Sequence, residues 1–477
     1  SAHPHIITAN ATEEGEEFMS AGVRAHAYRN VIVTAATAGL AGLLFGYDTG
    51  VIAGALLQIE PDFGINGFKS GMVVSAVPIG AVLGAWFAST NSDKYGRRTL
   101  IVVSGIVFIV GALISALSPT DMLWVLISSR VLIGVAIGVA SAVAPVYISE
   151  VAPPDIRGRL VTFFQLAVTV GILVAYLVGL AFADANDGWR WMLGLGALPA
   201  ILLVVGISRL PSSPRWLLMK GREDDARAAL QRVRTEGSEQ IELEIQEIET
   251  SMNIHEGSWR DLLQPAVKAA LVVGIGLAIL QQITGINTVI YYAPTIIKET
   301  GIDGNSAAIL ASLGVGIINV IMTVVALRLL DSRGRREMLT IGVTGISVSL
   351  FLLGLAFLIG ADKTWATVMA IGSLMLFVSS FAISLGPIFW LLNAEIYPLS
   401  VRSKAASAGT MTNWFFNFVV SLTFLPLIDL LSQTGAFWFY GAVGLLTLWF
   451  CWKFVPETKG RSLEQINDIF ETRAKAK

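Results

Sequence analysis

Charged residues are scarce in this chain of 477 residues. Only 14% of its residues are Asp, Glu, Lys or Arg, whereas 54% are hydrophobic. Soluble domains carry about 25% charged residues, so the deficit excludes an ordinary soluble globular protein. Apolar stretches of about 20 residues recur along the chain, and this is the length that crosses the hydrocarbon core of a bilayer. The composition therefore predicts an all-α membrane protein with many spans.

The side chains that build metal sites and catalytic centres are also few. The single cysteine, Cys451, excludes an intramolecular disulfide and a cysteine-rich metal site. All four histidines, which are His3, His5, His26 and His255, lie outside the apolar stretches. We find no nucleophile–base pair, metal cluster or nucleotide-binding loop, so we expect no enzyme, no metal and no cofactor. The net charge of −2 and the lack of a basic tract argue against nucleic acid as a partner.

Twelve apolar spans are predicted, six on each side of a charged break at 210–266. They cover residues 31–57, 71–91, 100–118, 122–147, 160–183, 191–209, 267–297, 306–329, 338–360, 365–393, 404–428 and 435–454. We therefore divide the chain into a disordered cytoplasmic tail (1–28), a six-helix bundle (29–210), a cytoplasmic helical linker (211–266), a second six-helix bundle (267–455) and a cytoplasmic tail (456–477).

The two bundles resemble each other in sequence. Two charge motifs of the first half return in the second half at nearly one offset: DKYGRR at 93–98 as DSRGRR at 331–336, and Glu150 with Arg157 as Glu395 with Arg402. Internal repeats of this kind build transporters whose substrate site lies near mid-membrane. Lys and Arg concentrate in alternate short loops, which predicts that both termini lie in the cytoplasm.

Asp48 lies inside the first apolar span, in the stretch FGYDTG at 45–50. A carboxylate at the centre of a membrane helix costs roughly 2.5–3.5 kcal/mol, so it needs a cavity, a partner or a proton. Arg130, in the fourth span, is the candidate partner. Counting 1.5 Å per residue puts Asp48 about 25 Å from the inner end of its helix and Arg130 about 12 Å from the outer end of its own, at similar depth. The pair predicts a proton switch; the alternative is a static ion pair that only specifies packing.

Amide side chains interrupt several apolar spans: Gln165, Gln281, Gln282, Asn287, Asn319, Asn413 and Asn417. One or two of them would suit hydrogen bonds between helices, but so many predict a wet cavity. An amide offers both a donor and an acceptor, as a sugar hydroxyl does, and its neutrality favours a neutral ligand. Trp390 can stack on the apolar face of a sugar ring. The preceding pair Gly386-Pro387 predicts a break in the tenth span.

A series of motifs then identifies a resemblance: GYDTG at 46–50, DKYGRR at 93–98, PVYISEVAPPDIRGR at 145–159, PSSPRW at 211–216, QQITGIN at 281–287, YYAP at 291–294, GPIFW at 386–390, EIYP at 395–398, NW at 413–414 and PETKGRSLE at 456–464. From residue 31 to residue 470 the chain resembles the sugar porter family of the major facilitator superfamily. The resemblance implies two pseudo-symmetric six-helix bundles that work by alternating access.

The resemblance also implies roles for individual residues. It implies sugar contacts at Gln165, Gln281, Gln282, Asn287, Asn319, Trp390 and Asn413. It implies gate or wall positions at Phe45, Tyr291, Tyr292, Phe381, Gly386 and Trp414. It implies a cytoplasmic salt-bridge network, which joins the halves when the cavity opens outward, made by Asp93, Arg97, Glu150, Arg157, Arg215, Asp331, Arg335, Glu395 and Arg402. In the family, symporters carry an acid where this chain has Asp48, and passive uniporters generally lack it.

Five positions on the cytoplasmic side depart from the family pattern: Ser89, Asn91, Ser212, Ser332 and Ser403. We expect these substitutions to weaken the cytoplasmic network and to bias the protein toward the inward-open state.

The sequence as a whole predicts a monomeric, proton-coupled monosaccharide symporter of the plasma membrane. Hexoses are the expected substrates, with glucose or galactose first and xylose behind. The nearest alternative is a uniporter for the same sugars with a structural Asp48. A sugar-sensing receptor fits less well because only about 20 residues follow the last span, and a drug exporter fits poorly with an amide-rich cavity.

Overall fold

The structure, a computed structural model, describes residues 6–152, 157–234, 238–252, 258–360, 363–398, 400–459 and 463–475. Within these ranges it is helical and contains no strand. The N-terminal half contains α1 (Ile6–Phe63), α2 (Gly67–Tyr95), α3 (Arg97–Ala116), α4 (Leu123–Val151), α5 (Arg157–Ala181), α6 (Gly188–Gly194) and α7 (Ala197–Ser208). The linker contains α8 (Pro214–Met219), α9 (Glu223–Val233), α10 (Ser238–Met252) and a short 3-10 helix at Trp259–Leu263. The C-terminal half contains α11 (Pro265–Ile283), α12 (Ile286–Lys298), α13 (Asn305–Ser332), α14 (Arg335–Ile359), α15 (Thr364–Ala382), α16 (Leu385–Glu395) and α17 (Arg402–Phe454), and α18 (Leu463–Lys475) follows.

These helices form twelve membrane-crossing segments, as predicted. Eleven stretches are long and apolar enough to cross a bilayer. The longest of them, α17, has 53 residues and contains a residue with non-helical φ and ψ, Ser432, so it is two antiparallel spans joined at a tight turn. Three further spans are each built from two helices in series: α6 with α7, α11 with α12, and α15 with α16. The break between α15 and α16 falls just before Gly386-Pro387, as predicted for the tenth span.

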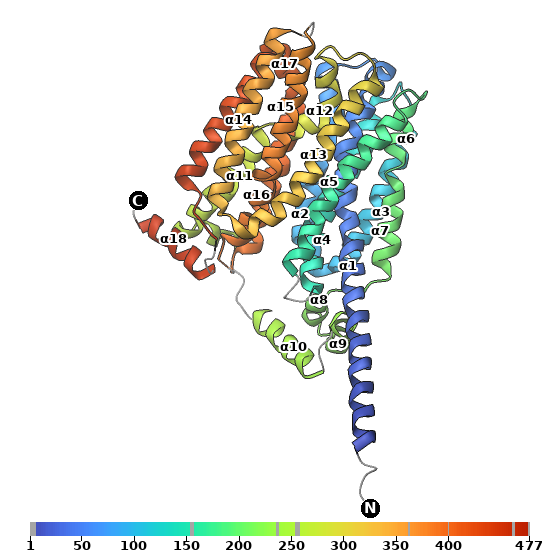
Figure 1. Cartoon of the computed structure of the whole chain (residues 1–477), viewed down its shortest axis with the longest axis vertical. Coiled ribbons are helices and arrows are strands. Elements are labelled where there is room, and N and C mark those ends of the chain that lie inside the picture. The colour runs from blue at the N-terminus through green and yellow to red at the C-terminus, as the bar shows by residue number, and fades with distance from the viewer. Residues whose placement is uncertain are drawn as a thin grey trace, which may run out of the picture.

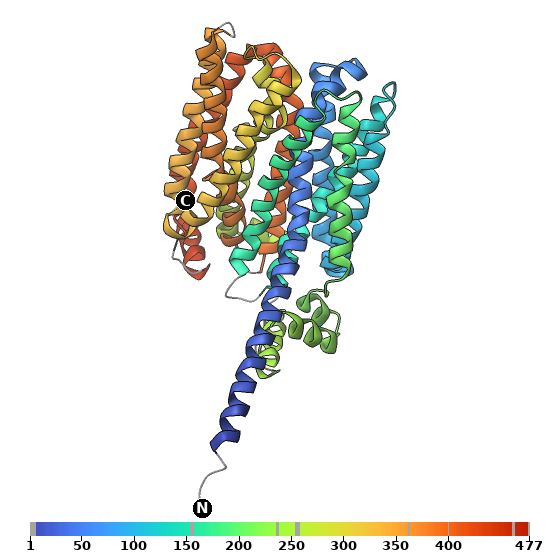
Figure 2. The same ribbon diagram turned by 45° about the vertical axis from the view of Figure 1, so that its right-hand side comes forward.

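The two halves stand side by side, and the start of α1, the C-terminal helix α18 and the linker helices lie at one end of the bundle (Figure 1). We call this end the terminal side and the opposite end the far side. Across the boundary between the halves, α2 packs against α17, α5 against α13, and α1 against α12. Figure 2 shows the same separation of the halves after a rotation of 45°.

Glycines allow the closest helix pairs within the N-terminal half. A Cβ atom on Gly134 of α4 would lie 2.1 Å from the carbonyl oxygen of Val77 in α2, and one on Gly80 of α2 would lie 2.2 Å from that of Val131 in α4. In membranes, where helix association depends on close packing, small residues at such contacts let the backbones touch. The helices α2 and α4 therefore form one closely packed unit.

The N-terminal segment differs from the predicted disordered tail. Helix α1 begins at Ile6 and continues without interruption into the first span, so residues 6–28 are helical. No proline follows Pro4 until Pro61, and this segment is rich in Ala and Glu, which favour helix. The helix consequently projects beyond the terminal side of the bundle (Figure 2).

Candidate functional site

A cavity of about 870 Å³, including the solvent space at its mouth, lies between the two halves. Helices α1 and α5 line it from the N-terminal half, and α11 to α13 and α15 to α17 line it from the C-terminal half. All seven predicted sugar contacts lie on its wall: Gln165, Gln281, Gln282, Asn287, Asn319, Trp390 and Asn413. The structure therefore brings together residues that are up to 248 positions apart in the chain (413 − 165).

Four of these amides hydrogen-bond to one another. Asn413 donates to the side-chain oxygen of Gln281 at 2.6 Å, Gln282 donates to Asn413 at 3.0 Å, and Asn287 donates to Gln282 at 2.6 Å. Gln281 also donates to the carbonyl of Leu385, at the start of α16, at 2.8 Å. These amides thus pair with one another and with a backbone carbonyl, and each bond in the cluster is one that a ligand hydroxyl can replace.

The other two amides are free to meet a ligand. Gln165 faces the cavity from α5 in the N-terminal half, and Asn319 faces it from α13 in the C-terminal half. Neither side chain has a hydrogen-bond partner within the part of the chain that the structure describes. Because a polar group in an apolar environment is costly without a partner, these two amides are available to bind the same ligand from opposite halves.

The predicted gate and wall residues divide into two groups. Phe45, Phe381, Gly386 and Trp414 line the cavity, and the rings of Phe45 and Trp414 meet across the halves with 5.0 Å between their centroids. Tyr291 and Tyr292 are buried behind the wall instead. The hydroxyl of Tyr291 accepts a bond from Asn417 at 3.3 Å, and that of Tyr292 donates to the carbonyl of Ser421 at 3.1 Å.

Asp48 and Arg130 lie next to each other, as their predicted depths require. Nη1 of Arg130 is 3.4 Å from Oδ1 of Asp48, Nη2 is 3.5 Å from Oδ2, and both side chains are buried. A shorter bond, of 2.9 Å, joins Nε of Arg130 to the carbonyl oxygen of Val73 in α2. Thr49, the neighbour of Asp48, lines the cavity. The ion pair is thus adjacent to the cavity, and its arginine is fixed to α2 independently of Asp48.

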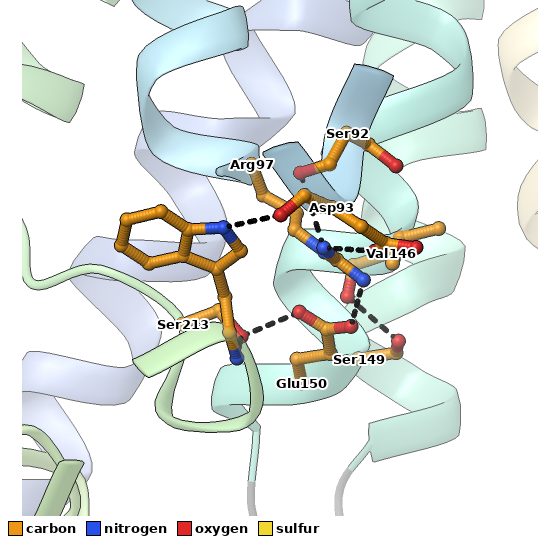
Figure 3. Close-up of polar contacts among 8 residues, drawn as sticks. Ser92, Asp93, Arg97, Val146, Ser149, Glu150 and Ser213 are labelled. Atoms are coloured by element: carbon orange, nitrogen blue, oxygen red, sulfur yellow. Dashed lines mark hydrogen bonds and ion pairs between the residues drawn. The ribbon is translucent and has the colours of Figure 1, made fainter. Parts of the chain in front are cut away.

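On the terminal side, the predicted network residues of the N-terminal half form one cluster. Arg97 donates to Asp93 at 2.6 Å and to Glu150 at 3.0 Å (Figure 3). The second oxygen of Glu150 accepts from the hydroxyl of Ser213, in the linker, at 2.5 Å. This cluster joins α2, α3, α4 and the linker. Every contact in it that the described residues make stays within the N-terminal half and its linker.

The corresponding residues of the C-terminal half make a different set of contacts. Arg335 donates to the carbonyl of Leu330 at 3.0 Å, and Arg402 donates to that of Tyr397 at 3.0 Å. Glu395 lies at the end of α16, within the electrostatic reach of both arginines. Arg215 is exposed. The side chains of Arg157 and Asp331 lie outside the described residues, so their predicted roles stay predictions.

The residues that depart from the family pattern bond locally where the structure shows a bond. Ser89 donates to the carbonyl of Trp86, Asn91 to that of Phe87, and Ser332 to that of Leu329, each within its own helix. Ser403 is exposed and Ser212 is half-buried. None of these contacts reaches the other half. The bias toward an inward-open state, predicted from these five positions, stays a prediction.

Some residues of the site were missed from the sequence. Three threonines line the cavity: Thr49, Thr169 and Thr323. The hydroxyl of each donates a hydrogen bond to a backbone carbonyl of its own helix. The carbonyl of Val73, which holds Arg130, is a backbone group and has no residue-type signal. The hydroxyl of Tyr176 donates to the carbonyl of Ile290 in the other half at 2.9 Å. The signal that could have found this last contact is a proline four residues after the acceptor.

Known proteins resemble this chain over nearly its whole length. Residues 34–470 match the family described as "Sugar (and other) transporter". The chain is 43% identical over 427 residues to a D-xylose transporter of Levilactobacillus brevis, which covers 90% of this chain and 93% of that protein. It is 41% identical over 434 residues to the galactose-proton symporter of Escherichia coli, which covers 90% of this chain and 92% of that protein.

Solved structures agree with these relatives. A partially occluded inward open conformation of the xylose transporter XylE from Escherichia coli matches this structure with a TM-score of 0.80 at 31% identity, over 91% of this chain and 100% of that chain. An inward open conformation of the same transporter gives a TM-score of 0.79 at 32% identity, over 92% and 99% of the two chains. The chain therefore belongs to the sugar porter family of the major facilitator superfamily, and it is a multi-pass membrane transporter of sugars and not an enzyme.

Proposed function

We propose that this transporter is a proton-coupled symporter of monosaccharides, with hexoses as its principal substrates. The observation that carries the proposal is the placement of a buried carboxylate–arginine pair next to a cavity lined by neutral amides from both halves. Relatives that are named as D-xylose, glucose and galactose-proton transporters support a monosaccharide as the substrate.

The cavity suits a neutral polyhydroxyl ligand. Its polar wall consists of amides and hydroxyls, and Trp390 offers an aromatic face beside them. A sugar would exchange the bonds within the cluster of Gln281, Gln282, Asn287 and Asn413 for bonds to its own hydroxyls, and it would add bonds to Gln165 and Asn319. Because these last two residues belong to opposite halves, a bound sugar favours the closed arrangement of the cavity.

The proton acts at Asp48. With Asp48 ionised, its charge attracts Arg130 and holds α1 against the unit of α2 and α4. Protonation removes that attraction, while Arg130 keeps its bond to the carbonyl of Val73. Helix α1 is then released relative to α2 and α4. Because protonation can neutralise Asp48, this buried ion pair acts as a switch and not as a permanent structural contact.

Orientation follows from the charges. Both termini and the linker share the terminal side, where Lys94, Arg97, Arg98, Arg333, Arg335 and Arg336 also lie near helix ends. The positive-inside rule assigns this side to the cytoplasm of the plasma membrane. The charged cluster of Arg97 and Glu150 then forms the inner network, which we propose joins the halves only when the cavity opens outward. The unit of transport is a monomer, since one chain contains the whole cavity.

The decisive experiment separates proton coupling from sugar transport itself. The Asp48→Asn variant, in proteoliposomes with a pH gradient, is expected to lose accumulation of labelled glucose or galactose and to keep sugar exchange at zero gradient. A matched control is Asp62→Asn, in the same helix, where the amide oxygen can still accept the bond from Trp189; it is expected to keep accumulation.

Two results would overturn parts of this proposal. Accumulation that survives in Asp48→Asn, or wild-type uptake that never exceeds equilibrium, would make the protein a uniporter with a structural Asp48. Counterflow that is driven by xylose and not by hexoses would leave the proposed proton coupling intact and would show that the substrate is xylose.

A further inference from the structure

A proline in α12 leaves one backbone carbonyl without its helical donor. Pro294 lies inside α12, between Ile286 and Lys298. Proline has no N–H, so the carbonyl four residues earlier, that of Ile290, loses the hydrogen bond that an α-helix would normally give it. Buried backbone carbonyls are almost always paired. The group that pairs with Ile290 is therefore informative.

The partner comes from the other half of the molecule. The hydroxyl of Tyr176, in α5, donates to the carbonyl oxygen of Ile290 at 2.9 Å, and this bond is buried. The side chain of Tyr176 is 2% exposed, and Ile290 lies on the cavity wall. One hydrogen bond thus joins the N-terminal half to α12, immediately beside the cavity.

The ring of Tyr176 is held close to the C-terminal half. A Cβ atom on Gly316 of α13 would lie 3.0 Å from this ring. Toward the far side, Gly54 of α1 and Gly179 of α5 both lie next to Ile309 of α13. Along α5, Tyr176 thus lies between Ile172 on the cavity wall and Gly179 at the far-side contact.

A second proline places a carbonyl at the same boundary. Pro426 in α17 removes the helical donor of Leu422. The carbonyl of Leu422 lies against Gly71 of α2, where a Cβ atom would be 2.8 Å from the oxygen. Both carbonyls that these prolines release in the C-terminal half thus face the N-terminal half.

We propose that the hydrogen bond from Tyr176 to Ile290 is a latch that favours the state with the far side closed, and that Pro294 creates the need for it. When the halves part on the far side, the carbonyl of Ile290 opens to the cavity and accepts from water or a sugar hydroxyl. The latch affects the equilibrium between the states with the far side closed and open. Its test is independent of which sugar is carried and of whether Asp48 binds the proton.

The first variant is Tyr176→Phe, which removes the hydroxyl and keeps the ring. Spin labels on Asn186→Cys and Asp303→Cys, both exposed and in opposite halves, report the far-side separation in a Cys451→Ala background. The populations are measured by double electron–electron resonance in nanodiscs without added sugar. We expect the ratio of closed to open molecules to fall about tenfold, since the variant leaves a buried acceptor unpaired only in the closed state.

The second variant tests the part played by proline. Pro294→Ala restores an N–H that can bond to Ile290 within α12 in both states. In that background, Tyr176→Phe is expected to change the ratio less than about twofold, because the carbonyl no longer depends on the hydroxyl. Tyr147→Phe serves as the control, since its hydroxyl donates to the carbonyl of Pro211 at 2.7 Å within the N-terminal half and linker. An equal effect of Tyr176→Phe in both backgrounds, or no effect in the parent protein, would overturn the proposal.

Discussion

The carboxylate of Glu457 accepts hydrogen bonds from backbone N–H groups, two of which lie at the start of α14. Its two oxygens accept from the N–H groups of Arg335 at 3.0 Å, Arg336 at 3.1 Å and Lys459 at 3.0 Å. Burial raises the pKa of Glu457, but these N–H groups and the charge of Arg335 outweigh it and hold the pKa below the ordinary value of 4.5. The residue thereby caps α14 from the segment that follows α17.

At the residue scale, this cap predicts a pH-dependent stability. Because the folded pKa is lowered, the ionised cap stabilises the fold above pH 4.5, and this contribution is lost as the pH falls through the folded pKa. Glu457→Gln should lower the free energy of unfolding by about 1 kcal/mol at pH 7, a value for a half-solvated cap. Thermal unfolding in detergent should show this difference at pH 7 and a shrinking one below pH 4.5. Glu471→Gln, at an exposed site in α18, is the control. A difference that persists unchanged in acid would contradict the assignment.

Residue types explain which parts of the site the sequence could reveal. An amide in an apolar helix is visible because it is costly there, and the six amides among the predicted sugar contacts all line the cavity. Backbone acceptors carry no such signal. The carbonyl of Val73, which binds Arg130, could not be foreseen from residue types. The carbonyl of Ile290 could have been foreseen, because Pro294 lies four residues later and cannot donate a hydrogen bond to it.

At the scale of elements, the packing of α2 on α4 depends on glycine. A side chain on Gly134 has no room, since its Cβ would lie 2.1 Å from the carbonyl of Val77. Gly134→Ala should therefore force the helices apart, at a cost of about 1–3 kcal/mol. It should also reduce proton-driven uptake, because Arg130 lies one turn away and is bonded to α2.

The chain offers a matched control for this prediction. Gly372, in α15, has nothing within 4 Å of its Cβ position. Gly372→Ala should be neutral or should stabilise the protein by about 0.4–1 kcal/mol, because alanine lowers the entropy of the unfolded chain. Both variants are measured by thermal unfolding and by uptake in proteoliposomes. Equal effects of the two substitutions would show that the contact between α2 and α4 is not tight.

The interruptions within spans mark the limit of element prediction. Apolar length predicted all twelve spans, but it did not predict the break between α6 and α7 or the one between α11 and α12. Hydropathy averages over a window and does not register a single turn. Gly285, with φ of 90°, is the residue that allows the second break, and it precedes the amide of Asn287. This break is what lets Asn287 turn back to Gln282 at 2.6 Å.

At the scale of the whole molecule, the linker segment from Ser213 to Arg234 is attached to the N-terminal half, whereas the 3-10 helix at the end of the linker packs against α11 of the C-terminal half. Ser213 bonds to Glu150, and Asn30 of α1 donates to the carbonyl of Arg232 at 3.1 Å. Arg234, only 4% exposed, donates to the carbonyl of Val151 at the end of α4 at 2.8 Å. The sequence showed that a linker separates two repeats, but repeats alone do not say to which half a linker is attached.

This attachment predicts that α8, α9 and α10 move with the N-terminal half during transport. Spin labels on Gln231→Cys and Lys94→Cys should keep one distance when sugar and a proton gradient are added, whereas Gln231→Cys and Ser332→Cys should change theirs. Arg234→Ala should broaden the first distance, because it removes charge-assisted bonds worth about 1.5–3 kcal/mol each.

Arg227→Ala is the matched control, because among the described residues Arg227 pairs only with Glu223, Asp224 and Glu242, all inside the linker. Such exposed pairs contribute little to stability, so this variant should leave the first distance narrow. The opposite pattern, with the linker keeping its distance to Ser332 and losing that to Lys94, would place it with the C-terminal half. The linker would then be a strap that the N-terminal half releases, and the contacts of Arg234 would belong to only one state of the transport cycle.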